Sequence, residues 1–420
     1  MARRVLDFID RHELMRYLGN TSWMFAEQAL KLVSGVFVGI YVARYLGPER
    51  FGVYSYALAI VSVFMAVSKI GMESVLVREL VRHPDRRQEY MGTAFGLMVG
   101  ASLVSILVIG SLVSMIEDDH ATKVYVLIMS AGLIFQASLV VDYLFQSEVK
   151  ARLSSIAKSL ALSVNSIVKI ALVLAGADLL AFAIVFVIEQ LMVAVFLVFM
   201  YFREGRPSFF SSFRYSIIAR LLKSAWPMVM SGVAGMLLMR VDQVMIKHFL
   251  GAYQLGIYGA AAKIYEAWIV LPFILSISIL PLITQLKSGA REEYEKKLVW
   301  LFVIVFWTSI LFAIVISLTG ERLVLLAFGE GFDGAGAVLT ILIWASALSA
   351  FGFMSARYLV VEGMERKIAR RNWIAIMINI PLNLFMIPAY GIEGAAMATL
   401  ISLLIVHYLI DILDRDLHTL

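Results

Sequence analysis

Cysteine is absent from this chain, and charged residues are scarce. With no Cys among 420 residues, disulfides, thiolate catalysis and zinc-thiolate sites are all excluded. Asp, Glu, Lys and Arg make up only 16% of the sequence, and apolar and aromatic residues make up 61%. Soluble domains carry about 25% charged residues. Because so few polar side chains cannot cover a water-facing surface of this size, the composition argues against a soluble enzyme and favours a lipid bilayer as the solvent.

Catalytic and cofactor motifs are also missing. The sequence has no G-x-x-x-x-G-K-[ST] motif for ATP and no H-E-x-x-H motif, and its six histidines are scattered. The longest connection expected on the outer side, about 320–334, is too short to hold a sugar donor for a membrane-embedded glycosyltransferase or ligase. A net charge of +5 is too modest to indicate nucleic acid. We therefore expect no enzyme, no catalytic residue, no metal, no cofactor and no nucleic-acid partner.

The apolar residues form twelve stretches, each long enough to cross a membrane as a helix. They fall at about 18–43, 51–76, 92–115, 121–145, 153–175, 179–201, 225–248, 255–284, 298–319, 335–358, 370–389 and 391–413. Membrane strands would instead alternate over about ten residues. The sequence thus predicts an all-α membrane protein with twelve transmembrane helices in two pseudo-symmetric six-helix lobes around a central cavity.

Lys and Arg residues gather in every second connection, as Arg78 and Arg82, Arg214 and Arg220, and Lys296 illustrate. By the positive-inside rule, these connections and both chain termini are expected in the cytoplasm of a multi-pass cell-membrane protein. The predicted organisation follows from these boundaries. It comprises an interfacial helix at 1–17, which we expect to be retained, a first lobe at 18–201, a cytoplasmic linker at 202–224, a second lobe at 225–413 and a cytoplasmic tail at 414–420.

A short motif repeats once in each predicted lobe. YLGPERFGVY at 45–54 aligns without a gap with FLGAYQLGIY at 249–258, and both copies join the first and second spans of their lobe. The alignment pairs Gly47 with Gly251 and Gly52 with Gly256. A parallel repeat of this kind predicts lobes related by an axis along the membrane normal, with the substrate path between them.

Ionisable residues at membrane depth are costly and usually face a protein interior or a wet cavity. Eight of them fall in the first two spans of the two lobes: Glu27, Lys31, Lys69, Glu73, Arg240, Asp242, Lys263 and Glu266. Helical spacing predicts that Glu27 and Lys31, Lys69 and Glu73, and Lys263 and Glu266 each share a helix face. Two readings stay open for these pairs: a hydrated central cavity, which we prefer, or latches that hold helices together.

Other polar and proline residues lie in the predicted spans. They are Lys169, Glu189, Arg357, Asn379, Asn383 and His407, together with Pro227, Pro272 and Pro281. For Lys169, Glu189 and His407 a structural role is the first expectation. The prolines bend helices by removing backbone hydrogen bonds, which suits either a rocking transporter or simple packing kinks.

Several segments closely resemble polysaccharide-biosynthesis flippases of the Wzx (O-antigen) type. These are YLGPERFGVYSYALAIVSVFMAVSKIGMESVLVREL at 45–80, RVDQVMIKHFLGAYQLGIYGAAAKIYEAW at 240–268, FGEGFDGAG at 328–336 and YGIEGAAMATLIS at 390–402. The superfamily also contains multidrug and toxic-compound extruders and lipid II flippases. The resemblance implies two lobes that alternate access and move undecaprenyl-diphosphate-linked oligosaccharide from the inner to the outer leaflet.

The resemblance also implies a substrate site and partners. The family's cavity is lined largely by spans 1, 2, 7 and 8, so Arg240, Lys263, Lys31 and Lys69 are the candidates for binding the diphosphate. Glu27, Glu73, Asp242 and Glu266 are cavity acids and, together with Asp142, candidates for ion coupling. Since each deep cation has an acid nearby, a strongly anionic glycan is not expected. Partners are the lipid-linked glycan and membrane lipids, with polymerase machinery open; a cation-coupled multidrug extruder is the alternative function.

Overall fold

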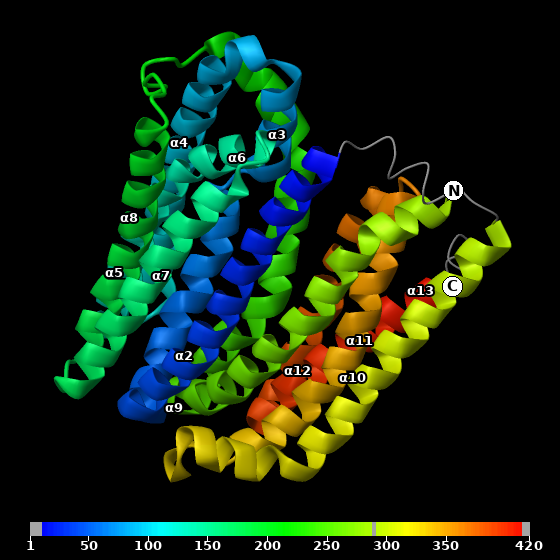
Figure 1. The fold of residues 1–420 in the computed structure, drawn as a ribbon. Coiled ribbons are helices and arrows are strands. Elements are labelled where there is room, and N and C mark those ends of the chain that lie inside the picture. Colours follow the sequence, from blue (N-terminus) through cyan, green and yellow to red (C-terminus); the bar gives the residue numbers. More distant parts are fainter. Residues whose placement is uncertain (1–10, 288–290, 414–420) are drawn as a thin grey trace. The chain divides into compact units, whose positions relative to one another are not determined.

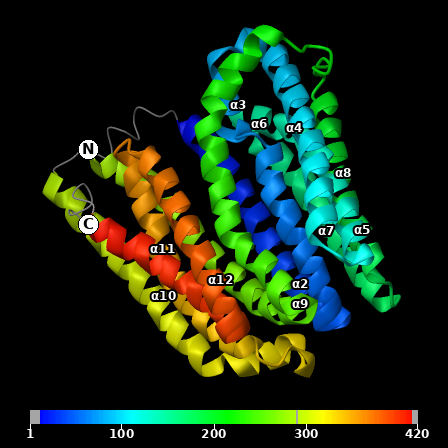
Figure 2. The same cartoon turned by 180° about the vertical axis from the view of Figure 1, so that it is seen from behind.

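The computed structural model describes residues 11–287 and 291–413, and the side chains of residues 22–276, 296–364, 366–411 and 413. All regular elements in these ranges are helices, so the predicted all-α fold is confirmed (Figures 1 and 2). The predicted interfacial helix at 1–17 lies outside the described residues up to position 10, and the predicted tail at 414–420 lies outside them entirely.

The elements follow one another in this order. They are α2 Arg11–Ser68, α3 Met72–Arg82, η1 Pro84–Arg86, α4 Arg87–Ile116, α5 His120–Ser130, η2 Ala131–Ser138, α6 Leu139–Ser147, α7 Ala151–Leu174, α8 Leu179–Arg203, α9 Tyr215–Lys287, α10 Arg291–Phe328, η3 Glu330–Phe332, α11 Ala335–Val361, α12 Glu365–Leu404, η4 Ile405–Leu409 and α13 Ile410–Leu413. Of the short η elements, η4 is a turn of π-helix and the others are 3₁₀-helices.

Nine helical segments within the described residues are long and apolar enough to cross a membrane. Three of them, Ser22–Arg82, Tyr215–Ser276 and Arg366–Leu409, have 61, 62 and 44 residues. A straight helix of the shortest of these would be about 65 Å long, roughly twice the thickness of a bilayer core. Within each long segment one helix is divided by a glycine with non-helical backbone angles, at Gly47, Gly251 or Gly391. Each segment therefore contains two long helices that meet at this glycine, and Ser22–Arg82 has a further turn at Ile70 and Gly71.

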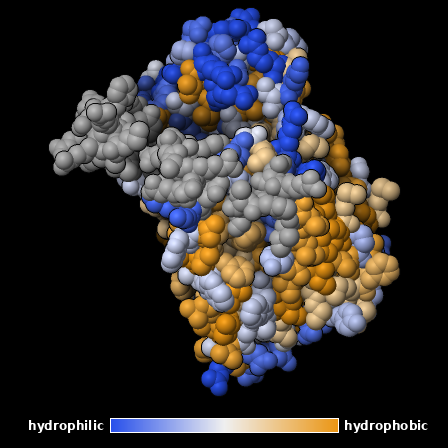
Figure 3. All heavy atoms as spheres, turned by 90° about the vertical axis from the view of Figure 1, so that its right-hand side faces the viewer, coloured by the Kyte–Doolittle hydropathy of each residue, from blue (hydrophilic) through white to orange (hydrophobic). Residues whose placement is uncertain are grey.

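Hydrophobic side chains cover much of the helix surface. Leu107, Leu174, Leu318 and Phe385 are among the large apolar side chains that remain exposed on four different helices. On the face drawn in Figure 3, hydrophobic residues form broad continuous areas and the most hydrophilic residues gather towards the edges. Apolar surface of this extent is stable only against lipid, which supports the expected membrane location.

The predicted continuous helix at 51–76 is wrong. Helix α2 ends at Ser68 and α3 starts at Met72, because the chain turns through Ile70 and Gly71 with φ angles of 46° and 58°. A Cβ on Gly71 would lie 2.8 Å from Cβ of Met228, so the turn also packs closely on α9. Since Lys69 and Glu73 lie on opposite sides of this turn, the prediction that they share one helix face is also wrong.

Two other predicted spans are interrupted. The stretch predicted at 121–145 contains the 3₁₀-helix η2 between α5 and α6, and the side-chain amide of Gln136 in η2 donates a 2.9 Å hydrogen bond to Gln190 of α8. The final span, predicted at 391–413, contains the π-helical turn η4. Turns of π-helix inside longer helices occur frequently at functional sites.

The chain divides by its own contacts into two compact units. The first unit holds the residues up to Val38 and Ile60–Gly232, and the second holds Gly39–Ala59 and the residues from Val233 onwards. The core of the first unit includes Leu76 of α3, Met91 of α4 and Phe145 of α6. Both copies of the repeated loop, at 45–54 and 249–258, therefore belong to the second unit.

Candidate functional site

The repeated loops have the same backbone conformation at their first glycines. Gly47 has φ 69° and ψ 170°, and Gly251 has φ 86° and ψ 178°. Side chains other than hydrogen are essentially excluded from this region of φ/ψ space, so both positions require glycine. In each copy the glycine ends one membrane helix and starts the next.

The second glycines of the loops allow the two loops to touch. A Cβ on Gly52 would lie 1.8 Å from the carbonyl oxygen of Ala252, and a Cβ on Gly256 would lie 1.9 Å from the carbonyl oxygen of Pro48. Each loop thus packs its glycine on the backbone of the other, and both belong to the second unit. The contact is reciprocal, as expected for two copies of one motif that meet around a local twofold axis.

The second unit holds a charge cluster on the two arms of α9. The guanidinium of Arg240 forms a forked ion pair with Glu266, with N–O distances of 2.6 and 3.2 Å. Asp242 is buried and accepts hydrogen bonds from the hydroxyl of Tyr258 and from the backbone N–H of Gln243. The sequence predicts only that Glu266 shares a helix face with Lys263, and the structure adds an ion pair of Glu266 with Arg240. The cluster therefore links the helices before and after Gly251.

Lys263 contacts residues of α2. Its Cε and Nζ atoms lie 2.0 and 2.5 Å from the position that a Cβ of Gly39 would take, so the side chain lies flat on that glycine. Its ammonium group also stands 5.9 Å from the ring centroid of Phe51, a cation–π distance. Lys263 is half-buried in the same unit as Gly39 and Phe51.

A cavity of about 340 Å³ lies beside the cluster inside the second unit. Asp242, Tyr258 and Glu266 line it on one side, and Arg357, Arg371, Thr399 and His407 are also among its lining residues. Most of the remaining wall is apolar. Convergent charged groups in an apolar cavity of this size are typical of ligand sites in membrane proteins.

The first unit holds a second charge cluster, built by α2, α6 and α7. The ammonium of Lys158 lies 3.1 Å from a carboxylate oxygen of Glu27 and 3.1 Å from one of Asp142. Lys31 also pairs with Glu27 at 2.6 Å, and the hydroxyl of Ser155 donates a 2.9 Å hydrogen bond to the same carboxylate. The side chains of Glu27 and Asp142 are only 7% and 8% exposed, so both carboxylates depend on these donors.

The remaining candidates are dispersed. Lys69 is half-buried at the turn after α2, and Glu73 is exposed. Lys169 pairs with Glu189 at 3.3 Å between α7 and α8, in agreement with the structural role expected for them. Asn383 donates a 2.8 Å hydrogen bond to Asn379, one turn earlier on α12.

Sequence reasoning missed two groups. Lys158 is not among the residues predicted for the site, although α7 begins at Ala151 and carries Lys158 two turns into the helix. Arg371 is not among them either, yet it is buried and donates hydrogen bonds of 3.0 and 2.8 Å to the carboxylate of Asp411. The sequence does contain a sign of the pair Arg371–Asp411. Asp411 is an acid within a predicted apolar span, where a carboxylate usually needs a cation as its partner.

Comparison with known proteins gives family and fold. The sequence model of the family described as polysaccharide biosynthesis protein matches residues 17–287, more than half of the chain, and a model described as MatE matches residues 227–385. A Shigella flexneri protein named as an O-antigen transporter is 22% identical over 91% of this chain and 94% of its own length. A Staphylococcus aureus protein named capsular polysaccharide biosynthesis protein CapF is 20% identical over 91% of this chain and 95% of its own.

Solved structures share the fold at lower sequence identity. The lipid II flippase MurJ in an inward closed conformation superposes with a TM-score of 0.73, covering 93% of this chain and 86% of its own, at 16% identity. A multidrug resistance MATE family transporter of the MOP superfamily in an inward-facing conformation gives a TM-score of 0.70 over 91% of this chain and 92% of its own, at 15% identity. The helices of this chain thus follow the path seen in those transporters.

Proposed function

The chain belongs to the polysaccharide biosynthesis protein family, and from this membership we propose that it is a flippase for lipid-linked glycans. It moves undecaprenyl-diphosphate-linked oligosaccharide units from the inner to the outer leaflet for surface polysaccharide assembly. The observation that carries this function is the likeness, over 91% of the chain, to the protein named as an O-antigen transporter. The chain is a membrane transporter and not an enzyme.

The proposed topology has twelve crossings in two six-helix lobes, with both termini in the cytoplasm. Its support is the nine apolar segments within the described residues and the non-helical glycines that divide three of them. The lobes at 18–201 and 225–413 are joined by the linker at 202–224. The positive-inside pattern of Lys and Arg supports the orientation.

In the proposed site, Arg240, Lys263, Lys31 and Lys69 attract the diphosphate of the lipid carrier. The forked pair of Arg240 with Glu266 supports this role. A guanidinium that donates two parallel hydrogen bonds to a carboxylate can donate them in the same way to two oxygens of a phosphate. When substrate binds, its diphosphate replaces Glu266 as the partner of Arg240. Candidates for coupling to an ion gradient are Glu27, Glu73, Asp142, Asp242 and Glu266. Membrane lipids and the lipid-linked glycan are the partners, and polysaccharide polymerase machinery is the proposed recipient of the product.

Reconstituted vesicles test the function. The purified chain is inserted into liposomes that contain a fluorescent undecaprenyl-diphosphate oligosaccharide, and a membrane-impermeant glycosidase is added outside. We expect the enzyme to digest nearly all of the labelled lipid in vesicles with the protein and only the outer-leaflet share in vesicles without it. Equal digestion in both preparations would overturn the proposal.

Two further measurements separate flipping from other activities. Labelled phosphatidylcholine in the same vesicles should stay in its leaflet, because unselective scrambling would expose any lipid. Uptake of an organic cation driven by a proton or sodium gradient should be absent. Uptake of the cation without glycan flipping would assign the chain to the extruder branch instead.

A further inference from the structure

The first unit contains a pocket at the ends of several of its helices, and its lining shares no residue with the charge clusters described above. Its volume is about 620 Å³, and it lies between the turn that leads into α4, the end of α6 and the segment 204–214 that follows α8. Four arginines line the pocket, namely Arg86, Arg87, Arg206 and Arg214. We call it the arginine pocket. A pocket of this volume can hold a phosphate together with a small headgroup.

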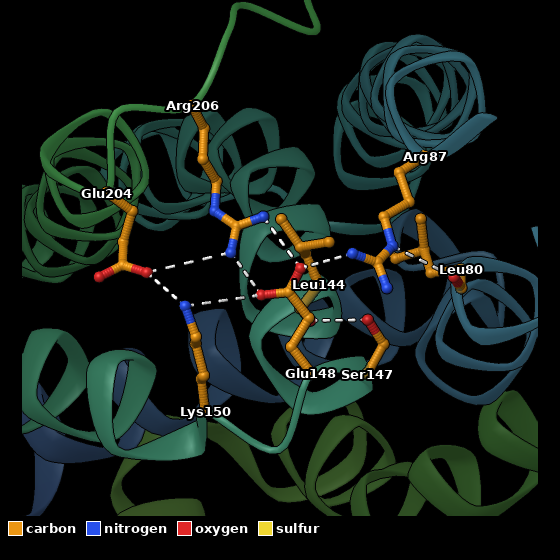
Figure 4. Close-up of polar contacts among 8 residues, drawn as sticks. All are labelled: Leu80, Arg87, Leu144, Ser147, Glu148, Lys150, Glu204 and Arg206. Atoms are coloured by element: carbon orange, nitrogen blue, oxygen red, sulfur yellow. Dashed lines mark hydrogen bonds and ion pairs between the residues drawn. The ribbon is translucent and has the colours of Figure 1, made fainter. Parts of the chain in front are cut away.

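Two carboxylates hold the four guanidinium groups in place, each between two arginines. Glu148 accepts a 2.8 Å hydrogen bond from Arg87 and a forked pair of hydrogen bonds from Arg206 (Figure 4). Glu89 accepts a 2.8 Å hydrogen bond from Arg86 and a 3.2 Å hydrogen bond from Arg214. Each carboxylate can neutralise one guanidinium and orients two.

Positive charge is therefore left over on the pocket wall. The four arginines stand against three carboxylates, namely Asp85 and Glu89 of the lining and Glu148, which binds Arg87 and Arg206, so the arginines exceed the acids by one charge. Lys150 and Glu204 form an ion pair that also contacts this group, since Lys150 lies 4.0 Å from Glu148 and Glu204 lies 4.0 Å from Arg206 (Figure 4). The ammonium of Lys150 lowers the pKa of Glu204, so this pair stays charged at neutral pH and does not offset the arginines. Accumulated positive charge beside polar donors attracts anions.

Hydrogen-bond donors other than arginine also face the pocket. The 30-residue helix α4 begins at Arg87, and within the described residues no side chain caps its N-terminus. The partial positive charge of that helix end adds to the arginines. Ser211 and Ser212 also line the pocket. An oxyanion there has guanidinium groups, a helix N-terminus and serine residues as its surroundings.

The segment that closes the pocket is anchored. The hydroxyl of Tyr201 donates a 2.7 Å hydrogen bond to the carbonyl of Pro207, and the N–H of Arg214 donates a 3.0 Å hydrogen bond to Thr93. A Cβ on Gly92 would lie 2.4 Å from the carbonyl oxygen of Phe209, so this segment packs directly on α4. The arginines it carries are consequently held in position before any ligand arrives.

The surroundings indicate a lipid rather than a soluble anion. The pocket lies where two apolar segments end, since Pro84–Ile116 begins there and Leu179–Arg203 ends there. Phe210 and Tyr215 on the closing segment are 45% and 82% exposed, and Phe213 lines the pocket. Exposed aromatic side chains at the ends of apolar helices mark the headgroup level of a bilayer.

We propose that the arginine pocket binds the phosphate of an anionic phospholipid headgroup at the membrane surface. This site is separate from the proposed substrate cavity and does not depend on glycan transport. Basic pockets at helix ends bind anionic headgroups in other membrane proteins through the same combination of guanidinium groups and interfacial position.

Binding of short-chain lipids to the purified full-length chain tests the proposal. The probes are dihexanoyl phosphatidylglycerol, dihexanoyl phosphatidylcholine, glycerol 3-phosphate and inorganic diphosphate, each titrated while thermal unfolding is followed by intrinsic fluorescence. We expect saturable stabilisation by phosphatidylglycerol and much weaker effects of the other three. Stronger stabilisation by glycerol 3-phosphate or diphosphate than by phosphatidylglycerol would overturn the assignment to a lipid.

Variants locate the site. Arg86→Gln and Arg214→Gln each leave Glu89 with its other arginine, so folding should be preserved, and loss of one charge-assisted hydrogen bond should weaken phosphatidylglycerol binding about tenfold. Arg220→Gln is the matched control, because Arg220 binds the hydroxyl of Tyr90 and does not line the pocket. Unchanged binding in both pocket variants would overturn the proposal.

A measurement on the unaltered chain covers the case in which a variant fails to fold. Phenylglyoxal modifies accessible guanidinium groups, and the modified peptides can be quantified by mass spectrometry. We expect phosphatidylglycerol to protect Arg86 and Arg214, which are 42% and 63% exposed, and to leave Arg82 unprotected. Equal modification of Arg86 and Arg214 with and without the lipid would contradict the proposal.

Discussion

Gly52 and Gly256 are in backbone contact: a Cβ atom on Gly52 would stand 2.9 Å from the amide nitrogen of Gly256. The two residues occupy the same place in two copies of one motif, about two hundred positions apart. The repeat is therefore visible in the sequence as similarity and in the structure as reciprocal packing. Each copy has a glycine where the backbone of the other copy passes.

Alanine at either of these glycines should destabilise the protein. Because the new Cβ of Gly52→Ala would lie 1.8 Å from the carbonyl oxygen of Ala252, the backbones must separate. We expect a loss of about 2–3 kcal/mol, at the upper end for overpacked sites, and a lower midpoint of thermal unfolding in detergent. Gly232→Ala on α9 is the matched control, since a Cβ there meets open space. Equal midpoints for Gly52→Ala and Gly232→Ala would contradict the packing described here.

Charge variants can decide what Arg240 does. Arg240→Ala leaves Glu266 without its partner in a membrane helix, which costs roughly 2.5–3.5 kcal/mol and lowers abundance. Arg240→Ala/Glu266→Ala removes both charges and should recover abundance. If Arg240 binds diphosphate, the double variant remains inactive in the vesicle assay at matched protein amounts. Wild-type flipping by the double variant would show that the pair only holds α9 together.

Lys263 requires a different comparison, because its side chain packs on Gly39. Lys263→Met keeps the packing on Gly39 and Phe51 while removing the charge. We expect normal thermal stability with glycan flipping reduced at least tenfold, the effect of losing one charge-assisted contact to phosphate. Lys169→Met is the control for a cation with a structural partner in the first unit. Full transport by Lys263→Met would remove this residue from the proposed site.

The first charge cluster should fail when Lys158 alone is neutralised. Lys158→Met leaves Glu27 and Asp142 as two buried like charges without the ammonium between them. We expect a loss of about 3–5 kcal/mol, as for other buried pairs that lose one partner. Lys158→Met/Asp142→Asn should regain most of the thermal stability, because Lys31 and Ser155 still hold Glu27. Identical midpoints for the single and double variants would show that the two carboxylates are not coupled.

Absence of cysteine makes the orientation directly measurable. Asp118→Cys and Ser208→Cys place single thiols at exposed positions after α4 and after α8. With both termini in the cytoplasm, an impermeant maleimide added to intact cells should label Asp118→Cys and not Ser208→Cys until the cells are opened. The reverse pattern would invert the proposed topology.

Sequence alone predicted the all-α membrane fold and the glycines at which helices meet, because both are local properties. The length of an apolar run can be read directly from the sequence, and Gly47 and Gly251 each lie between two such runs. The turn at Ile70 and Gly71 was not predicted, since the apolar run continues through it. At this turn Gly71 packs closely on Met228, and such a contact between residues far apart in sequence cannot be read from an apolar run.

Sequence reasoning was weaker on the charges. Spacing along one helix indicated which groups could pair locally, and Glu27 with Lys31 does so. It could not indicate that Arg240 crosses the Gly251 loop to Glu266, or that Lys158 enters between Glu27 and Asp142. These partners are set by how α2, α6, α7 and the two arms of α9 pack, and that information is not in the spacing.

The assignment of Gly39–Ala59 to the second unit has a consequence for how this protein can be divided. Consider a chimera that is joined at the linker and takes one half from a relative. In such a chimera Gly52 would no longer face the Gly256 loop of its own chain, on which it packs. A gene split near residue 208 should likewise give a second fragment that lacks a helix hairpin of its own unit until the first fragment supplies it. Segments exchanged with a relative should therefore begin and end at positions 38–39, 59–60 and 232–233. The hairpin at 39–59 is then exchanged together with the C-terminal half.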